Sequence, residues 1–342
     1  MSFTIFSRTK EIVSDIFFSE QILALILRMK PDINKSSTYI DVYGSVKCST
    51  NLKATIENIR QGFNAKLYPK LTEDGTSGAY RMRDANKNNI AIFKPIDEEP
   101  FAPNNPRGHN GEFGSQTFRP GVLSGESCIR EVAAYLIDRG HFSDVPSTTF
   151  VEVVHSSLKY VPFTGVEVTS DFYFDTLSTL ITPVEETPTS KQPAGKLSKS
   201  KLGTSLDNKD SIAMKIAQET QIGMKFGSLQ EFCANEGAIE NYGSDRFHTD
   251  DVHKIAILDL RIFNMDRNEQ NILVKIKTKV DKKDGVKRRI MTLVPIDHGL
   301  CIPDNLAICS FDLAWLSWVQ AEKPFSKKSL QYIEAIQIMK DI

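Results

Sequence analysis

The chain has 342 residues, of which 40% are hydrophobic and 25% are charged, and its formal net charge is −1. This composition is typical of a soluble globular protein large enough to bury two cores, and it gives no whole-chain bias towards nucleic acid. The five Cys are scattered without a CxxC pair, which argues against a disulfide framework or a zinc site and favours a reducing cytosol. The longest uncharged run near the N-terminus is too short to span a bilayer, so we expect neither a signal peptide nor a transmembrane segment.

Helical spacing dominates the start of the chain. Between residues 8 and 29, apolar side chains recur at helical intervals, which predicts an amphipathic helix that packs against protein, with contact at a membrane surface as the alternative. A second helix is expected in LKATIENIRQGF, residues 52–63. We therefore expect residues 1–64 to form an N-terminal helical extension.

From about residue 65 the pattern changes to short strands separated by turns. AKLYPKL, AYRMRD and NIAIFKP predict three strands, and EDGTSG and ANKN are the turns between them. Residues 97–122 are rich in Pro, Gly and Asn and should be mostly loop. A helix is then expected in SGESCIREVAAYLIDRG, where Ser124 or Ser127 can cap the start and Gly140 can close the end.

The remainder of the chain moves from strand to helix. STTFVEVVHSSLKYVPFT predicts a strand, and residues 183–210, which have almost no large apolar side chain, predict a mobile insertion. TDDVHKIAILDLRIFN predicts a helix begun by a Thr cap, and NILVKI and RIMTLVPID predict two strands joined by a Lys-rich turn. FDLAWLSWVQ and KSLQYIEAIQIMKD are expected to be helical. A β-rich front half and a more helical back half, joined near residues 220–230, predict a two-lobed α+β fold.

Three polar residues in the back half have a spacing that suggests chemistry. Residues 259–271 read DLRIFNMDRNEQN, and VPIDHG follows at 294–299. Asp266 and Asn271 have the five-residue separation of a kinase catalytic loop, in which the Asp meets the acceptor hydroxyl and the Asn holds a metal ion. Asp297 in the IDHG turn corresponds to the metal-binding Asp of such a site. Because apolar segments flank these residues, a solvated surface is a poor explanation for them.

A phosphate-transferring site of this kind needs further parts, and each has a candidate in the front half. In EDGTSGAY, Gly75 and Gly78 allow a tight turn with amide donors for phosphate oxygens, although a plain hairpin turn is the alternative. Lys94, at the end of the third strand, is the candidate that neutralises phosphate charge. Glu131, in the helix that follows, is the candidate that holds Lys94. Taken singly, a solvated Lys and a solvent-facing Glu remain the alternatives.

Several longer strings strengthen this interpretation: FKPIDEEPFAPNNPRG, REVAAYLID, GSLQEF, VHKIAILDLRIFNMDRNEQNILV and LVPIDHGLCIPD. In the same order, from about Ala65 to the C-terminus, they resemble the phosphatidylinositol 3-/4-kinase superfamily, most closely the plant-type gamma branch of the phosphatidylinositol 4-kinases, which is related to the type II enzymes. The resemblance implies a two-lobed protein-kinase-like fold, with a β-rich N-lobe at about 65–224 and a helical C-lobe at about 225–342. Because few residues follow Asp297, it also predicts a C-lobe that lacks several helices.

The resemblance also implies ATP and Mg²⁺ as cofactors and a role for each matching residue. The phosphate loop would be Gly75, Thr76, Ser77 and Gly78, with Lys94 on the phosphates and Glu131 supporting Lys94. Catalysis would fall to Asp266 and Arg267, and Mg²⁺ would be held by Asn271 and Asp297. Adenine is expected at a hinge near Lys225, Phe226 and Gly227.

The activity implied by the resemblance is transfer of the ATP γ-phosphate to the inositol 4-hydroxyl of phosphatidylinositol. Two alternatives remain open: a protein Ser/Thr kinase, because gamma-branch members are also associated with that activity, and an ATP-binding pseudokinase or scaffold. The family pattern is DRHxxN, and here Asn268 replaces the His, which is a reason to keep the pseudokinase alternative.

A basic segment bears on the choice of partner. KIKTKVDKKDGVKRR, residues 275–289, predicts contact with an anionic membrane surface, against the alternative of a solvated hairpin turn. The expected partners are therefore phosphatidylinositol in anionic membranes or protein substrates, without nucleic acid. We expect a cytoplasmic protein that attaches peripherally to membrane where this segment meets lipid. The sequence indicates no oligomeric state.

Overall fold

The computed structural model describes residues 38–43, 48–158, 224–280, 287–306 and 309–336, and the structural statements below concern these residues. The helix predicted at residues 8–29 and the insertion predicted at 183–210 lie outside them. Within the described ranges, each helix is too short or too polar to cross a bilayer.

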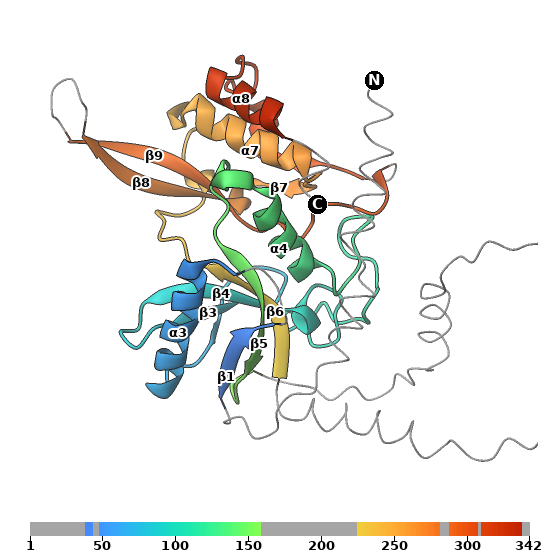
Figure 1. Cartoon of the computed structure of the whole chain (residues 1–342). Helices are drawn as coiled ribbons and strands as arrows, with labels where there is room; N and C mark the ends of the chain where they lie inside the picture. The colour runs from blue at the N-terminus through green and yellow to red at the C-terminus, as the bar shows by residue number, and fades with distance from the viewer. Residues whose placement is uncertain (1–37, 44–47, 159–223, 281–286, 307–308, 337–342) are drawn as a thin grey trace, which may run out of the picture. The chain divides into compact units, whose positions relative to one another are not determined.

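A six-stranded antiparallel sheet, with the order β1-β5-β6-β4-β3-β2, is formed by the front half of the chain together with residues 224–231 (Figure 1). Its strands are β1 (Tyr39–Val42), β2 (Lys70–Leu71), β3 (Tyr80–Arg83), β4 (Asn89–Pro95), β5 (Thr148–Val154) and β6 (Met224–Glu231). The predicted strands in AYRMRD, NIAIFKP and STTFVEVV are confirmed, whereas AKLYPKL contributes the two residues of β2.

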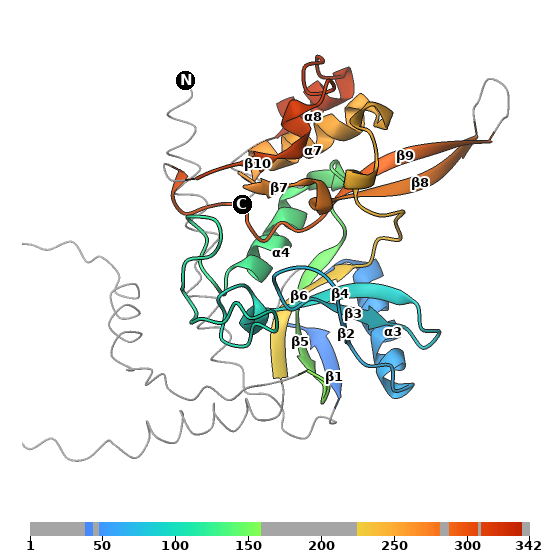
Figure 2. The same ribbon diagram turned by 180° about the vertical axis from the view of Figure 1, so that it is seen from behind.

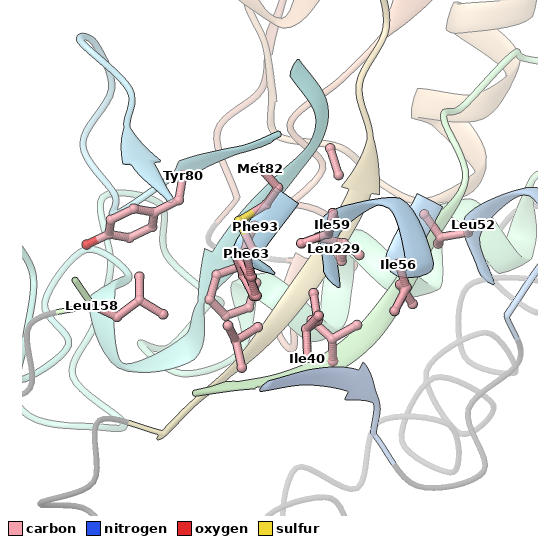
Figure 3. Close-up of a cluster of buried hydrophobic side chains, with 13 residues drawn as sticks. Ile40, Leu52, Ile56, Ile59, Phe63, Tyr80, Met82, Phe93, Leu158 and Leu229 are labelled. Atoms are coloured by element: carbon pink, nitrogen blue, oxygen red, sulfur yellow. The ribbon is translucent and has the colours of Figure 1, made fainter. Parts of the chain in front are cut away.

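Helix α3 (Thr50–Asn64) covers one face of this sheet. Ser49 begins the helix, because its side chain accepts a hydrogen bond from the Leu52 backbone N–H at 3.1 Å. The apolar stripe of α3 and alternate residues of the strands form one hydrophobic cluster, which includes Ile40, Leu52, Ile56, Ile59, Phe63, Met82, Phe93 and Leu229 (Figure 3).

This cluster concerns the C-terminal part of residues 1–64, which were predicted to form an N-terminal helical extension. The predicted helix at 52–63 is present, but it shares its core with the sheet, and β1 pairs with β5 along its whole length. The described residues 39–43 and 48–64 therefore belong to the same folded unit as the sheet, since separating them would expose the apolar side chains of both.

Helix α4 (Ser127–Ile137) packs against the opposite face of the sheet, where Cys128 and Val132 cluster with Phe150 of β5. The predicted caps, Ser124 and Ser127, do not close its N-terminus. Instead the carboxylate of Glu99 accepts backbone N–H bonds from Gly125, Ser127 and Cys128 at 2.8 to 3.0 Å. A buried carboxylate at this end suits the positive pole of the helix. At the other end, Gly140 has a φ of 62° in the turn that follows.

The back half is built on α7 (Thr249–Arg261), α8 (Lys327–Ala335) and the hairpin of β8 (Ile272–Val280) and β9 (Lys287–Pro295) (Figure 1). These elements lie where they were predicted, with two differences. The two strands continue into the segment predicted as a Lys-rich turn, β8 as far as Val280 and β9 from Lys287. His248 rather than Thr249 caps α7, by accepting from the Asp250 N–H at 3.2 Å. A short parallel pair joins β7 (Asp266–Arg267) to β10 (Asp312–Leu313), as Figure 2 shows.

The α-helix predicted in FDLAWLSWVQ is wrong. This segment contains β10 and a short 3-10 helix, Ala314–Ser317. Trp315 and Trp318 are three residues apart, a spacing that suits either helix type, and both are buried in the core with Ile255 of α7 and Ile272 of β8. Pairing of β10 with β7 and burial of the two indole rings decide the local structure here.

Candidate active site

Lys94, at the end of β4, is joined to Glu131 of α4 and to Asp297 after β9. Its Nζ lies 2.5 Å from Glu131 Oε1 and 3.1 Å from Asp297 Oδ1. Burial alone would lower the pKa of Lys94, but Asp297 and Glu131 together raise that pKa above its usual value. Burial likewise favours a raised pKa for Glu131, yet Lys94 and His298 outweigh it and hold the pKa well below its usual range. Lys94 and Glu131 therefore form a charged pair, and the predicted partners lie together.

The turn after β9 separates a buried residue from an exposed one. Asp297 has a φ of 55°, which is uncommon for a residue other than Gly, and its side chain is 52% exposed. His298, directly after it, is fully buried with its Nδ1 3.5 Å from Glu131 Oε2. The buried ring fixes the turn beside Glu131, and the Asp297 carboxylate, paired with Lys94 through one oxygen, stays half exposed to solvent.

Asp266 and Asn271, on the connection from α7 to β8, lie side by side. Asn271 Nδ2 donates to the backbone oxygen of Asp266 at 2.7 Å and lies 3.5 Å from the Asp266 carboxylate. Asn268, which stands where the family pattern has His, donates from Nδ2 to Asp266 Oδ2 at 3.3 Å. The Asp266 carboxylate is thus held by two amide side chains, and its other oxygen lies 2.9 Å from Arg119 Nη2.

Arg267, predicted as catalytic, has no access to a substrate because its side chain is fully buried. It bonds both carboxylate oxygens of Asp259 on α7, and its Nη1 donates to the carbonyls of Asn271 at 2.7 Å and Ile296 at 2.5 Å. The guanidinium therefore fixes α7, the loop with Asp266 and the turn with Asp297 relative to one another. Arg267 is a positioning residue, which corrects the predicted role.

Asp259 is a site residue that the sequence-based prediction missed. It is buried, and besides Arg267 it accepts hydrogen bonds from Asn264 Nδ2 and Trp315 Nε1, each at 2.9 Å. A carboxylate among the apolar side chains of α7 was the signal that could have revealed it, because a buried charge requires partners. Its partners come from the connection after α7 and from the segment after β10.

The predicted phosphate loop lies between β2 and β3. Because Tyr80 pairs with Phe93, the loop is at the end of the sheet where Lys94 lies. Gly75 has a φ of 102°, and a Cβ on Gly78 would lie 2.1 Å from a carboxylate oxygen of Glu98, so both positions require glycine. Within the described residues, the backbone N–H groups of Gly75, Thr76 and Ser77 make no hydrogen bond, which leaves them available to an anion.

Two side chains from the Pro-rich segment after β4 hold this loop, and neither was predicted to do so. Arg107 donates to the carbonyls of Thr72 at 2.5 Å and Glu73 at 3.1 Å, and Asn105 donates to the carbonyl of Thr76 at 2.9 Å. The Thr76 carbonyl therefore points towards Asn105, on the opposite side of its peptide unit from the free Ser77 N–H.

The predicted hinge near Lys225, Phe226 and Gly227 is misplaced, because all three residues lie inside β6 and pair with β5. Lys225 is fully buried, with its Nζ 2.5 Å from Asp97 and 2.8 Å from Glu98. A Cβ on Gly227 would lie 2.0 Å from the Lys94 backbone oxygen, so this glycine allows two strands to approach and does not mark a hinge. The connection out of the sheet follows Glu231.

The donors near Asp266 fit a magnesium ion. Mg²⁺ takes oxygen ligands and retains several from water or phosphate. The half-exposed Asp297 carboxylate can supply one such oxygen, and Asn271, whose Nδ2 is used in bonding Asp266, keeps its Oδ1. Within the described ranges, no three His, Cys, Asp or Glu side chains gather as a metal cluster, so phosphate oxygens would have to complete the coordination.

Taken together, a strand Lys paired with a helix Glu, an Asp and an Asn on a loop, and an Asp after a hairpin are the parts of a kinase site. A family model, "Phosphatidylinositol 3- and 4-kinase", matches residues 75–342. The chain therefore belongs to the phosphatidylinositol 3- and 4-kinase family, and membership implies a kinase-like fold and, in general, the use of ATP and a divalent metal ion.

The chain is also similar to named plant proteins. It is 34% identical over 305 residues to "Phosphatidylinositol 4-kinase gamma 6" of Arabidopsis thaliana, covering 88% of this chain and 40% of that protein. It is 32% identical over 310 residues to "Phosphatidylinositol 4-kinase gamma 4" of Oryza sativa subsp. japonica, covering 87% and 42% respectively. The chain thus spans less than half the length of these relatives.

Proposed function

We propose that this chain transfers the γ-phosphate of ATP to the inositol 4-hydroxyl of phosphatidylinositol. The observation that carries the proposal is the linked geometry of the two halves of the site. Lys94, Glu131 and Asp297 form one charged group, and Arg267 bonds the carbonyls of both Ile296 and Asn271, which fixes that group against the loop with Asp266. The names of the plant relatives support the lipid acceptor.

Each residue has a physical task in this proposal. ATP with Mg²⁺ supplies the phosphoryl group and part of the charge neutralisation, and Asn271 and Asp297 would hold the metal ion. Lys94, kept charged by Glu131, binds phosphate oxygens together with the free N–H groups of residues 75–77. Asp266 orients the acceptor hydroxyl and accepts its proton. We place adenine beside the connection that follows Glu231.

The β8–β9 hairpin supports an acceptor at an anionic surface. The base of the hairpin is at the site, since Ile272 pairs with Pro295 directly beside Asn271 and Ile296. Exposed basic side chains continue along its described part, at Lys277, Lys287 and Arg289. Each basic residue near an anionic leaflet contributes on the order of 1 kcal/mol to the free energy of membrane binding. The hairpin would therefore bring the site to a membrane that contains the lipid acceptor.

A side-by-side transfer assay tests the proposal. The chain is incubated with labelled ATP and Mg²⁺ and offered phosphatidylinositol vesicles or a mixture of protein substrates, with Asp266→Asn as the matched inactive control. We expect labelled phosphatidylinositol 4-phosphate from the parent chain and a loss of product with the variant. Label on protein alone would support the Ser/Thr kinase alternative. Nucleotide binding without transfer to either acceptor would support the pseudokinase alternative.

A further inference from the structure

The carboxylate predicted to accept the proton is already paired with a cation. Arg119 Nη2 lies 2.9 Å from Asp266 Oδ1 and 3.7 Å from Asp312 Oδ2, and its Nη1 donates to Ser310 Oγ at 3.4 Å. Asp266 and Asp312 occupy the same register position of the parallel pair β7–β10. Two like charges at one position are balanced by one guanidinium from a distant part of the chain.

The turn that carries Arg119 is fixed in place. Gln116 and Leu123 form an isolated bridge across it, and Gln116 Nε2 donates to the backbone oxygen of Arg119 at 2.9 Å. The carbonyl of Gly121, two residues later, accepts from the Asp304 N–H at 2.8 Å. The backbone of Arg119 is therefore anchored beside the site, while its side chain, which is 24% exposed, keeps access to solvent.

This pairing restricts which acceptors can reach Asp266. A neutral hydroxyl that approaches the Asp266 carboxylate must displace a guanidinium, and it offers no charge in return. An acceptor with its own phosphate gives the guanidinium a new anionic partner while its hydroxyl takes the place on Asp266. Arg is suited to this exchange, because its planar fork can bond two oxygens of a phosphate. Asp312 can continue to balance Arg119 throughout the exchange.

We propose that Arg119 binds the phosphate of the acceptor's head group and thereby selects phosphorylated alcohols over neutral ones. The inference rests on the proposed phosphotransfer and specifies the chemistry of the acceptor. It gives Arg119 a duty distinct from that of Lys94, because Lys94 pairs with Glu131 and Asp297, whereas Arg119 pairs with Asp266 and Asp312.

Three acceptors with the same nucleotide test this inference. They are glycerophosphoinositol, which carries a phosphodiester, free myo-inositol, which carries none, and water, read as ATP hydrolysis. We expect Arg119→Gln to lower kcat/KM for glycerophosphoinositol by about 10- to 100-fold, the usual effect of losing a charged hydrogen bond, and Arg119→Lys to restore part of it. Transfer to myo-inositol and to water should not fall. Arg246→Gln, at an exposed Arg in the turn Ser244–Arg246, is the matched control.

Other outcomes overturn the inference. An equal loss for all three acceptors would mean that Arg119 maintains the fold or serves ATP, and an equal gain would mean that it merely blocks Asp266. If the parent transfers phosphate neither to these acceptors nor to phosphatidylinositol vesicles, the proposed function fails, and binding then decides the inference separately. Calorimetric titration with glycerophosphoinositol, in the presence of Mg²⁺ and a non-hydrolysable ATP analogue, should show binding to the parent and to Arg246→Gln but not to Arg119→Gln. No binding to the parent, or equal binding to all, contradicts it.

Discussion

The two halves of the site differ in how their charges are held. On the nucleotide side, Lys94, whose side chain is 22% exposed, lies between Glu131, which is 2% exposed, and Asp297, which is 52% exposed, so the buried partner is Glu131. On the acceptor side, Asp266 and Arg119 are both about one quarter exposed, and they meet across a single ion pair. A buried pair is costly to break because each partner would lose its counter-ion without regaining water, whereas a partly exposed pair exchanges partners readily. The comparison indicates a preformed Lys94–Glu131 pair on the nucleotide side and an exchangeable Arg119–Asp266 pair on the acceptor side.

The largest expected effect comes from removing the residue that fixes the two halves together. Arg267→Gln leaves Asp259 buried without its cation, and we expect the free energy of unfolding to fall by about 3–5 kcal/mol. Urea unfolding measures the change. Arg60→Gln, which removes an ion pair with Asp41 between side chains 38% and 48% exposed, should cost less than about 1 kcal/mol. Equal effects of the two substitutions would show that the Arg267 network does not hold the site.

An intermediate effect is expected from the carboxylate that caps α4, the helix that carries Glu131. Burial, partly offset by backbone N–H bonds, raises the pKa of Glu99 from 4.5 to about 7. Between these values the folded chain binds a proton that the unfolded chain does not, so the free energy of unfolding falls as pH rises through this window. The contribution is complete below about pH 4.5 and is lost above about pH 7.

Glu99→Gln cannot titrate, so it should flatten this pH dependence. We expect the fall in unfolding free energy between pH 5 and pH 8 to be smaller in the variant by about 1–3 kcal/mol. Urea unfolding at several pH values measures it, with the exposed Glu57→Gln as the control. Parallel pH profiles for parent and Glu99→Gln would rule out titration of the cap.

The smallest effect concerns the acceptor side. Lys287→Gln with Arg289→Gln removes two exposed charges from the hairpin, and binding to vesicles that contain phosphatidylinositol should weaken by about five- to thirtyfold at low salt. The difference should shrink as salt screens exposed charges. Nucleotide affinity should not change, because neither substituted residue belongs to the charged group of Lys94, Glu131 and Asp297. Vesicle co-sedimentation measures the binding. Equal binding of the parent and the double variant at low salt would show that the hairpin is only a solvated turn.

The contacts of Lys94 with Glu131 and Asp297 were the more predictable ones, because each of these residues belongs to a short motif on or beside a regular element. Lys94 ends a strand with clear alternation, and Glu131 lies on a helix with a clear apolar stripe. The same local reading failed where long-range contacts decide the role of a residue. The family resemblance placed a hinge near Gly227, yet this position needs glycine because the backbone of β4 passes too close for a side chain.

On the acceptor side, the controlling contacts join segments that are far apart in the chain. Arg119 reaches Asp266 across almost half of the chain, and nothing in FRPGV indicates that partner. Arg267 stands next to the predicted Asp266 in the sequence. It can be completely buried because its charge is paired with the buried Asp259, eight residues earlier on α7. Sequence patterns fix which face of an element is buried, whereas they do not give the partner of a charged side chain.

Nucleotide titration of two Asp variants tests the central claim, which is that the two halves of the site have different duties. A non-hydrolysable ATP analogue with Mg²⁺ is titrated calorimetrically into the parent, Asp297→Asn and Asp266→Asn. The account predicts that Asp297→Asn weakens Mg²⁺-dependent binding about tenfold or more, whereas Asp266→Asn leaves affinity within about threefold and lowers transfer by a factor on the order of 10²–10⁴. A parent chain that binds no nucleotide, or two variants with the same loss of affinity, would contradict it.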